Sequence, residues 1–405
     1  MSRFRWLPDP FMLAAVGLLL LIGLTVNYST SLPDSSGSLS HFNRQLAWIG
    51  SGLIVMFMTA AFPSKIFQSL SYAIYGLSLL SLVLVLLFGN KEMGATRWFA
   101  VGPVHLQPSE FAKIAILLGI ARFLGDHPRE LDRGWVTVVA VLMAIVPMGL
   151  ILIQPDLGTS LVFPVLLFCL LAWAGIPTIY LLIMITPVIA VVTSWHAILH
   201  VVALVVLIVA AYLASRRLMP TVMAAGIFLL IGAAAPMLWN KLHPYQQKRL
   251  LTFLNPEADP LGSAYQLIQS KIAIGSGGVF GKGFLKGTQT QLKFLPEGHT
   301  DFIFSAWAEE FGFIGAALVV ALFFLLFYRG IVLAAKCHNR HYSLVAVGVV
   351  CVLIFQALAN LLMTVGFLPV TGLPLPFLSY GGSSMLTTMV AMGLLLGIDL
   401  RWREY

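Results

Sequence analysis

The chain has 405 residues, of which 59% are apolar and only 10% are charged, with a formal net charge of +8. Soluble proteins carry about a quarter charged residues, so this composition excludes a soluble multidomain protein and a large soluble catalytic domain. The three cysteines, Cys169, Cys337 and Cys351, have no metal-binding spacing and form no obvious pair. They indicate neither a disulfide framework nor a zinc site.

Apolar runs of membrane-spanning length recur along the whole chain, and each bilayer crossing needs about 20 such residues. We predict twelve spans at about 10–29, 43–62, 66–88, 109–124, 135–153, 156–174, 177–194, 198–214, 220–238, 302–328, 342–365 and 384–400. The predicted fold class is therefore all-α: a polytopic integral membrane protein of about ten to twelve helices, with residues 1–405 forming a single membrane domain.

Cations are distributed unequally between the two sides of these spans. If both termini are cytoplasmic, thirteen cations lie inside: Arg3, Arg5, Lys65, Arg122, Arg129, Arg133, Arg216, Arg217, Arg329, Lys336, Arg340, Arg401 and Arg403. The short outer loops then hold only Arg44, Lys91 and Arg97. This bias follows the positive-inside rule and predicts a cytoplasmic membrane protein with both termini inside. Because topology explains the high pI, nucleic acid is not expected as a partner.

Two spans open with the same pattern, a Gln-Pro dipeptide followed by an acidic residue. In the first, Pro108 suits the first helical position, and Glu110 and Lys113 share a helix face, so we expect them to pair. Lys113 could alternatively line a cavity and contact an anion, because charged groups at membrane depth are usually functional. In the second, Asp156 is expected to cap its helix.

Residues 240–300 form the one long polar segment, and the predicted topology places it outside the cell. Its cations exceed its acids, since Lys241, Lys248, Arg249, Lys271, Lys282, Lys286 and Lys293 face only Glu257, Asp259 and Glu297. This excess favours an anionic ligand at the membrane surface, although contact with anionic lipid heads would also explain it. Leu261, Tyr265, Ile268 and Ile272 recur at helical spacing and predict an amphipathic helix at the interface. We expect the active site in this extracytoplasmic loop.

Six glycines follow this helix, at positions 275, 277, 278, 281, 283 and 287. The spacing is not a phosphate-binding loop, because Ser276 occupies the first glycine position and Gly283 follows Lys282 where Ser or Thr is required. The glycines indicate either simple turns or a close approach of the backbone to a ligand.

The span that follows the loop carries acids from its outer end inward: Asp301, then Glu309 and Glu310 about 12–14 Å deeper. At least one of the deeper acids should face a polar interior or pair with a cation. His299 beside Asp301 is a candidate polar site residue. His196 and His200 lack a third ligand for zinc, and the segment 379–384 lacks the glycine that a nucleophile elbow needs before its serine.

Taken together, these motifs resemble one family, the SEDS proteins, which include RodA, FtsW and SpoVE. The matching segments are Gly94 to Trp98, Gln107 to Lys113, Gln154 to Thr159, Asn255 to Gly283, Phe294 to Phe304 and Pro374 to Ser384. Lys286-Gly287-Thr288-Gln289, before the segment from Phe294 to Asp301, looks more like RodA, the elongation enzyme, than FtsW, the division enzyme.

The resemblance implies a peptidoglycan glycosyltransferase that polymerises lipid II outside the cytoplasmic membrane and releases undecaprenyl diphosphate. Such a step needs a base for the acceptor 4-hydroxyl and cations for the diphosphate. By residue type Glu257, Asp259, Glu297 and Asp301 are equal candidates, and the family motif places the essential acid at Asp259.

The remaining assignments follow from charge and from position within matching motifs. We expect substrate binding by Arg97, Lys113, Arg249, Lys271, His299, Asp301 and Ser379, and support by Trp98, Glu110, Asp156 and Glu309. No metal ligands are assigned, although the family implies that a divalent cation, Mg²⁺ or Mn²⁺, is possible. The implied partners are a class B penicillin-binding protein transpeptidase, other rod-complex membrane proteins and lipid II.

One feature departs from the family, which usually has ten spans. The surplus lies in residues 177–218, a possible extra helical hairpin. Two other functions remain compatible with the sequence. A lipid II flippase would also place charges such as Glu110, Lys113 and Glu310 within the membrane. A non-catalytic scaffold would tolerate replacement of Asp259.

Overall fold

A computed structural model describes residues 8–32, 40–92, 95–101, 104–241, 244–255, 259–260, 262 and 264–402. Several residues used in the sequence analysis lie outside this part of the chain: Arg3, Arg5, Gly94, Glu257, Leu261 and Arg403.

A helix lies at each of the twelve predicted spans, so the predicted fold class is confirmed. They are α1 (Pro10–Ser31), α2 (Ser40–Ala61), α3 (Ser64–Phe88), α4 (Pro108–Asp126), α5 (Gly134–Ile153), α6 (Leu157–Ser160) continuing into α7 (Val162–Ala174), α8 (Thr178–Thr193), α9 (Ala197–Ser215), α10 (Leu218–Lys241), α14 (Ile303–Lys336), α15 (Arg340–Val365) and α16 (Gly382–Arg401). Among the described residues, ten of these spans are long and apolar enough to cross a membrane. The other two are α8, which is shorter, and α4, which carries four charged residues.

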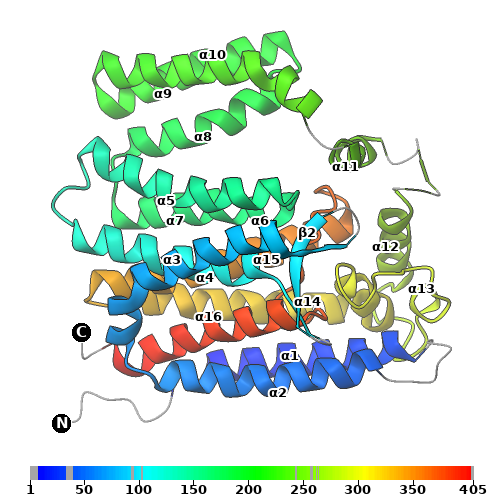
Figure 1. Cartoon of the computed structure of the whole chain (residues 1–405). Coiled ribbons are helices and arrows are strands. Elements are labelled where there is room, and N and C mark those ends of the chain that lie inside the picture. Colours follow the sequence, from blue (N-terminus) through cyan, green and yellow to red (C-terminus); the bar gives the residue numbers. More distant parts are fainter. Residues whose placement is uncertain are drawn as a thin grey trace.

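The helices differ in how far protein surrounds them. About 78% of the most apolar part of α16 and 72% of that of α15 are buried, against 11% for α9, so α15 and α16 are central and α9 faces outward. The main core joins side chains of α1, α4, α7, α14, α15 and α16. Helices α8, α9 and α10 pack mainly on one another around a second core and reach the bundle through α7. They form a separate layer (Figure 1).

Both ends of the described chain lie at one end of the bundle. The backbone N–H of Asp9 donates to Asp399 of α16 at 2.7 Å, and Nε of Arg329 in α14 donates to the Asp9 carboxylate at 2.7 Å. The segment 244–302 lies at the opposite end, where it forms α11 (Pro244–Leu254), α12 (Tyr265–Ser276) and α13 (Thr288–Gln291) (Figure 1). The predicted helix is therefore confirmed as α12, and its position at the membrane interface stays a prediction.

A small antiparallel sheet covers part of this second end, and the sequence analysis did not predict it. Its strands are β1 (Asn90–Glu92), β2 (Ala95–Val101) and β3 (Val104–Leu106), in the order β1-β2-β3. Strand β2 places Trp98 opposite Asn90 and Phe99 opposite Leu106. Aromatic and β-branched residues are concentrated in this segment, which favours extended backbone.

Candidate functional site

Asp259 lies on the segment between α11 and α12, where its carboxylate pairs with Lys248. The distance from Lys248 Nζ to Asp259 Oδ2 is 3.0 Å, and the two side chains are 59% and 41% exposed. Because both groups are partly in water, the pair is weak and either member can exchange it for another partner. Asp259 is therefore accessible to a substrate, as a base must be.

Gly262 determines where this carboxylate can lie. The N–H of Ala264 donates to the Asp259 carbonyl at 3.2 Å and folds the chain into a turn. A Cβ at Gly262 would stand 2.4 Å from both carboxylate oxygens of Asp259. Only a residue without a side chain therefore leaves room for the carboxylate in this position.

A cavity of about 220 Å³ opens beside this pair, between α11 and α12. It is lined by Lys248, Arg249, Thr252, Phe253, Gln266, Leu267 and Val370. Two cations among mostly uncharged residues suit an anionic group. Arg249 also donates from Nη1 to the Val370 carbonyl at 3.0 Å, which joins α11 to the loop before α16.

Asp301 approaches the same place from the start of α14. A Cβ on Gly372 would lie 3.7 Å from Asp301 Oδ2 and 3.9 Å from Arg249 Nη1, so the two side chains meet over that glycine. Asn360 holds the segment by donating to the Asp301 carbonyl at 2.8 Å. Burial, together with the Glu297 carboxylate, raises the pKa of Asp301 to about 6, against the opposing effect of Arg249.

This raised pKa predicts a pH-dependent stability. The folded protein holds the Asp301 proton more tightly than the unfolded chain, so the free energy of unfolding should fall as pH rises from about 4 to about 6. One pKa unit is worth about 1.4 kcal/mol, and Asp301 is partly exposed, so we expect a loss of about 1–3 kcal/mol. Thermal unfolding of wild type and Asp301→Asn across this range measures it. The advantage of the variant should grow up to about pH 6 and then level off; a constant difference would contradict the assignment.

His299 and Ser379 lie next to Asp301 but differ in exposure. The Tyr380 N–H donates to the His299 carbonyl at 2.9 Å, and the rings of His299 and His41 are 5.0 Å apart. Ser379 is buried, with its hydroxyl donating to the Thr300 carbonyl at 2.7 Å and accepting from the Leu375 N–H at 2.8 Å. Its hydroxyl therefore positions backbone, while the half-buried His299 ring is the group that can reach a ligand.

Arg97 and Asp156 both hold the turn that follows α5. Arg97 Nε donates to the Gln154 carbonyl at 3.0 Å, and its Nη2 donates to the Pro155 carbonyl. Asp156 accepts from the Thr159 N–H at 3.2 Å, which confirms the predicted helix cap, and from Gln107 at 2.9 Å. Trp98, on the neighbouring position of β2, stands edge-on to His105 at 6.4 Å.

Glu110 and Lys113 form the expected pair, with Lys113 Nζ 2.8 Å from Glu110 Oε1. Their side chains are only 4% and 1% exposed, and Pro108 occupies the first turn of α4 as predicted. The ammonium group is thus held within the helix bundle rather than presented to an open surface.

Lys271 projects from α12 and lies against the end of α15. A Cβ on Gly366, which has a φ of 85°, would stand 2.1 Å from its Cε and 2.5 Å from its Nζ. A cation at a helix C-terminus is favourable. Within the part of the chain that the structure describes, Lys271 forms no ion pair, so its charge is available to an anion.

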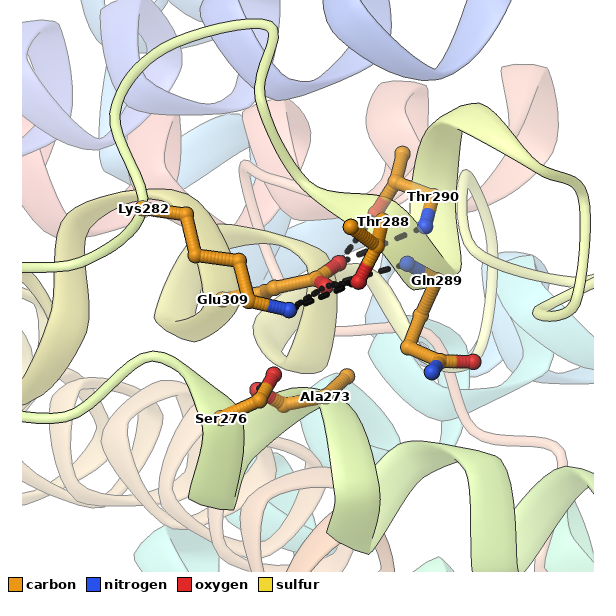
Figure 2. Close-up of polar contacts among 7 residues, drawn as sticks. All are labelled: Ala273, Ser276, Lys282, Thr288, Gln289, Thr290 and Glu309. Carbon is orange, nitrogen blue, oxygen red and sulfur yellow. Dashed lines mark hydrogen bonds and ion pairs between the residues drawn. The ribbon is translucent and has the colours of Figure 1, made fainter.

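Glu309 anchors the glycine-rich segment to α14 (Figure 2). Its carboxylate is completely buried and accepts from five donors: Lys282 Nζ at 2.7 Å, Thr288 Oγ1 at 3.1 Å, Gln289 N at 3.0 Å, Thr290 N at 3.3 Å and Thr290 Oγ1 at 3.2 Å. The prediction that Glu309 or Glu310 faces a polar interior or pairs with a cation is confirmed at Glu309.

Contacts between neighbouring segments connect several of the sequence-predicted residues at this end of the bundle. Ser383 joins two parts of it, because its hydroxyl donates to the His105 carbonyl and accepts from the Gln107 N–H, each at 3.1 Å. Gly158 of α6 packs against the Thr371 carbonyl. Glu309 lies in a different cluster, with the glycine-rich segment.

Lys248 and Lys282 were not selected as site residues from the sequence. Lys248 contributes only to the charge of the long loop and Lys282 also to the rejected phosphate-loop pattern, and nothing in their spacing identifies their partners. Among the described residues there is no group of three His, Cys, Asp or Glu side chains that could hold a metal ion.

Comparison with known proteins gives consistent matches over nearly the whole chain. The family model for FtsW, RodA and SpoVE, described as "Cell cycle protein", matches residues 10–203 and 195–404. The chain is 37% identical over 393 residues to the peptidoglycan glycosyltransferase MrdB of Escherichia coli K12, covering 96% of this chain and 93% of that protein. It is 33% identical to the peptidoglycan glycosyltransferase RodA of Treponema pallidum, covering 97% and 98%.

A solved structure also resembles the whole chain. It is described as "Structural coordination of polymerization and crosslinking by a peptidoglycan synthase complex" and matches with a TM-score of 0.70 and 33% identity, covering 98% of both chains.

Proposed function

The chain belongs to the FtsW, RodA and SpoVE family, and from this we infer that it is a peptidoglycan glycosyltransferase. It polymerises lipid II into glycan strands on the outer face of the cytoplasmic membrane, with release of undecaprenyl diphosphate, and serves rod-shape elongation. The observation that carries this function is the position of Asp259, a partly exposed carboxylate beside a cation-lined cavity at the end of the bundle opposite the ends of the described chain.

The chemistry assigned to each group follows from its position. Asp259 takes the proton from the 4-hydroxyl of the acceptor sugar as that oxygen attacks the anomeric carbon of the donor. The bond from that carbon to the diphosphate breaks, and its electron pair leaves with the undecaprenyl diphosphate. Arg249 and Lys271 stabilise the negative charge that develops on the leaving group. Lys248 can also turn toward the leaving group, because its ion pair with Asp259 is exposed to water and easily broken.

We propose that any divalent cation in the reaction is bound jointly by the protein and by the phosphates of the substrate. Mg²⁺ commonly binds through one or two carboxylates together with substrate phosphates. Asp259 could supply the carboxylate, and no step above depends on the ion.

We propose that both termini are cytoplasmic and that α11–α13 lie outside, a topology supported by the thirteen cations on one side against three on the other. The partner we propose is a class B penicillin-binding protein, together with other rod-complex membrane proteins. Its support is the resemblance to a protein solved in a peptidoglycan synthase complex that coordinates polymerisation and crosslinking.

We further propose that α8 and α9, within residues 177–218, are an additional hairpin inserted into the family fold. Two observations support this. The family match divides into two parts that meet at residues 195–203, and α8–α10 pack mainly on one another.

The decisive experiment measures polymer formation from labelled lipid II in proteoliposomes. The purified chain is tested alone and with a class B transpeptidase whose own active site has been inactivated. Long glycan strands in either case establish the glycosyltransferase. Movement of lipid II between leaflets without polymer would instead support a flippase, and neither activity would support a scaffold.

Replacing Gly262 with alanine should lower turnover without unfolding the protein. The added Cβ displaces the Asp259 carboxylate from its position, and a shift of about 1 Å at a reacting group can lower the rate about 100-fold. The polymerisation rate and the unfolding temperature should be measured together. Gly275→Ala is the matched control, because a Cβ there meets no neighbouring atom. Equal rates in both variants would show that Gly262 does not position the base.

A further inference from the structure

Helix α14 is broken at Gly312, and a distant segment fills the break. Gly312 has φ 65° and ψ −160°, which opens the two helical hydrogen bonds that Phe313 and Ile314 would donate to Glu309 and Glu310. All four freed groups are satisfied by the glycine-rich segment. Lys282 N donates to Glu309 O and Gly283 N donates to Glu310 O, both at 3.0 Å. Phe313 N donates to Gly278 O at 2.9 Å, and Ile314 N to Val279 O at 3.2 Å.

The fit depends on glycine at three positions. A Cβ would stand 2.1 Å from the Ala308 carbonyl oxygen at Gly277, 2.1 Å from the Glu310 carbonyl oxygen at Gly281, and 2.3 Å from the Gly281 nitrogen at Gly312. The glycine cluster therefore serves a close approach of two backbones within the protein, whereas the sequence indicated either simple turns or a close approach to a ligand.

Two contacts between α1 and α14 give the depth of this break. At one end Arg329 binds Asp9, and at the other Ser29 donates to Glu310. Twenty residues of helix separate Asp9 from Ser29, and nineteen separate Glu310 from Arg329, so each path is about 30 Å long. That length equals the thickness of the hydrocarbon layer. With Arg329 at the inner boundary, Glu310 lies at the outer boundary and Phe313 lies just inside it.

The side chains that surround this depth are apolar and uncovered. Phe280 is 81% exposed, Phe313 69%, Val279 57%, Ile314 54% and Phe284 43%. Because Gly278 and Val279 pair with Phe313 and Ile314, the loop residues share the depth of those helix residues. The charged Lys282 points toward the buried Glu309 (Figure 2).

We propose that residues 277–284 form a re-entrant loop that lies in the outer leaflet, with Val279 and Phe280 among the lipid acyl chains. Non-helical backbone is stable at such depth only when its polar groups are satisfied by protein, as they are here. An apolar patch of this kind is unfavourable in water. Since α12 leads directly from the Asp259 segment into the loop, the loop sets the height of that segment above the hydrocarbon layer.

The test measures the surroundings of a fluorophore at position 280. In a chain whose Cys169, Cys337 and Cys351 are replaced, Phe280→Cys is labelled with an environment-sensitive dye and reconstituted in phosphatidylethanolamine–phosphatidylglycerol vesicles. Two quenchers are compared: lipids with a nitroxide high on the acyl chain, and aqueous iodide. Phe324→Cys, on the exposed middle of α14, is the lipid control, and Lys286→Cys, two residues beyond the loop, is the water control.

We expect the dye at position 280 to be quenched severalfold more by the lipid nitroxide than by iodide, as at 324, and the reverse at 286. Quenching by iodide at the level of position 286 would overturn the proposal. Protection from both quenchers would also overturn it, because it would show that protein covers the loop. Thermal unfolding of each labelled chain shows whether the label disturbs folding. If the label at position 280 does so, Val279→Cys provides a second position for the same measurement.

Discussion

Replacing Asp259 with asparagine is expected to lower glycan polymerisation by about 10²- to 10⁴-fold, the usual contribution of general base catalysis. Asparagine keeps the shape of the side chain but cannot accept the proton of the acceptor hydroxyl. Because the carboxylate is 41% exposed and its pair with Lys248 is weak, the protein should stay folded. Rates from labelled lipid II, with the unfolding temperature of each sample, measure both effects.

The matched control is Glu297→Gln, which alters another carboxylate at the same end of the bundle. Glu297 accepts from the Thr300 hydroxyl at 2.6 Å, so its role in the geometry is to hold the segment before α14. We expect it to retain most of the activity. Loss of polymer in Glu297→Gln with activity in Asp259→Asn would transfer the role of base from Asp259 to Glu297.

The features that could be predicted from the sequence are those in which neighbouring residues determine one another. Apolar runs identify the spans because any helix that crosses the hydrocarbon layer needs an apolar sequence, whichever helices it packs against. The pairing of Glu110 with Lys113 and the cap made by Asp156 also followed, since partners three residues apart meet on any helix or first turn.

Contacts between distant segments could not be predicted in this way. Lys282 and Glu309 are 27 residues apart, and neither periodicity nor composition says that one loop will fill a break in the next helix. Gly312 lies in an apolar span where glycine is ordinary. The only local indication was the glycine cluster, which pointed to simple turns or to a ligand and not to a second backbone.

The same limit applies to the candidate site. Charge indicated the outer loop, whereas the selection of Asp259 among four acids depended on the family motif. In the structure Arg249 and Asp301, which are 52 residues apart, meet over Gly372, and Ser379 proves to be buried with its hydroxyl satisfied by backbone. Exposure and hydrogen bonding of this kind depend on the complete fold.

Replacing Glu309 with alanine should destabilise the protein by about 3–5 kcal/mol, the range found when one member of a buried ion pair is removed. The substitution leaves Lys282 without its partner and removes the acceptor for the N–H groups of Gln289 and Thr290. Because Lys282 is 25% exposed and can turn toward water, the lower half of the range is expected. Thermal unfolding and the rate of proteolysis between residues 277 and 292 measure the effect.

Glu310→Gln is the control variant, because it shows how much stability is lost when a buried carboxylate outside the Glu309 hydrogen-bond cluster is changed. Glu310 is equally buried, but its Oε2 has no hydrogen-bond partner in the described structure, so an amide can replace it with little loss. Glu309→Gln, by contrast, points an NH₂ group at donors that already require an acceptor, and it should lose more stability than Glu310→Gln. A double-mutant cycle with Lys282→Met assigns the share carried by the ion pair. If Glu309→Ala were as stable and as resistant to protease as wild type, the five hydrogen bonds would not hold the loop on α14, and pairing of the two backbones alone would have to account for its position.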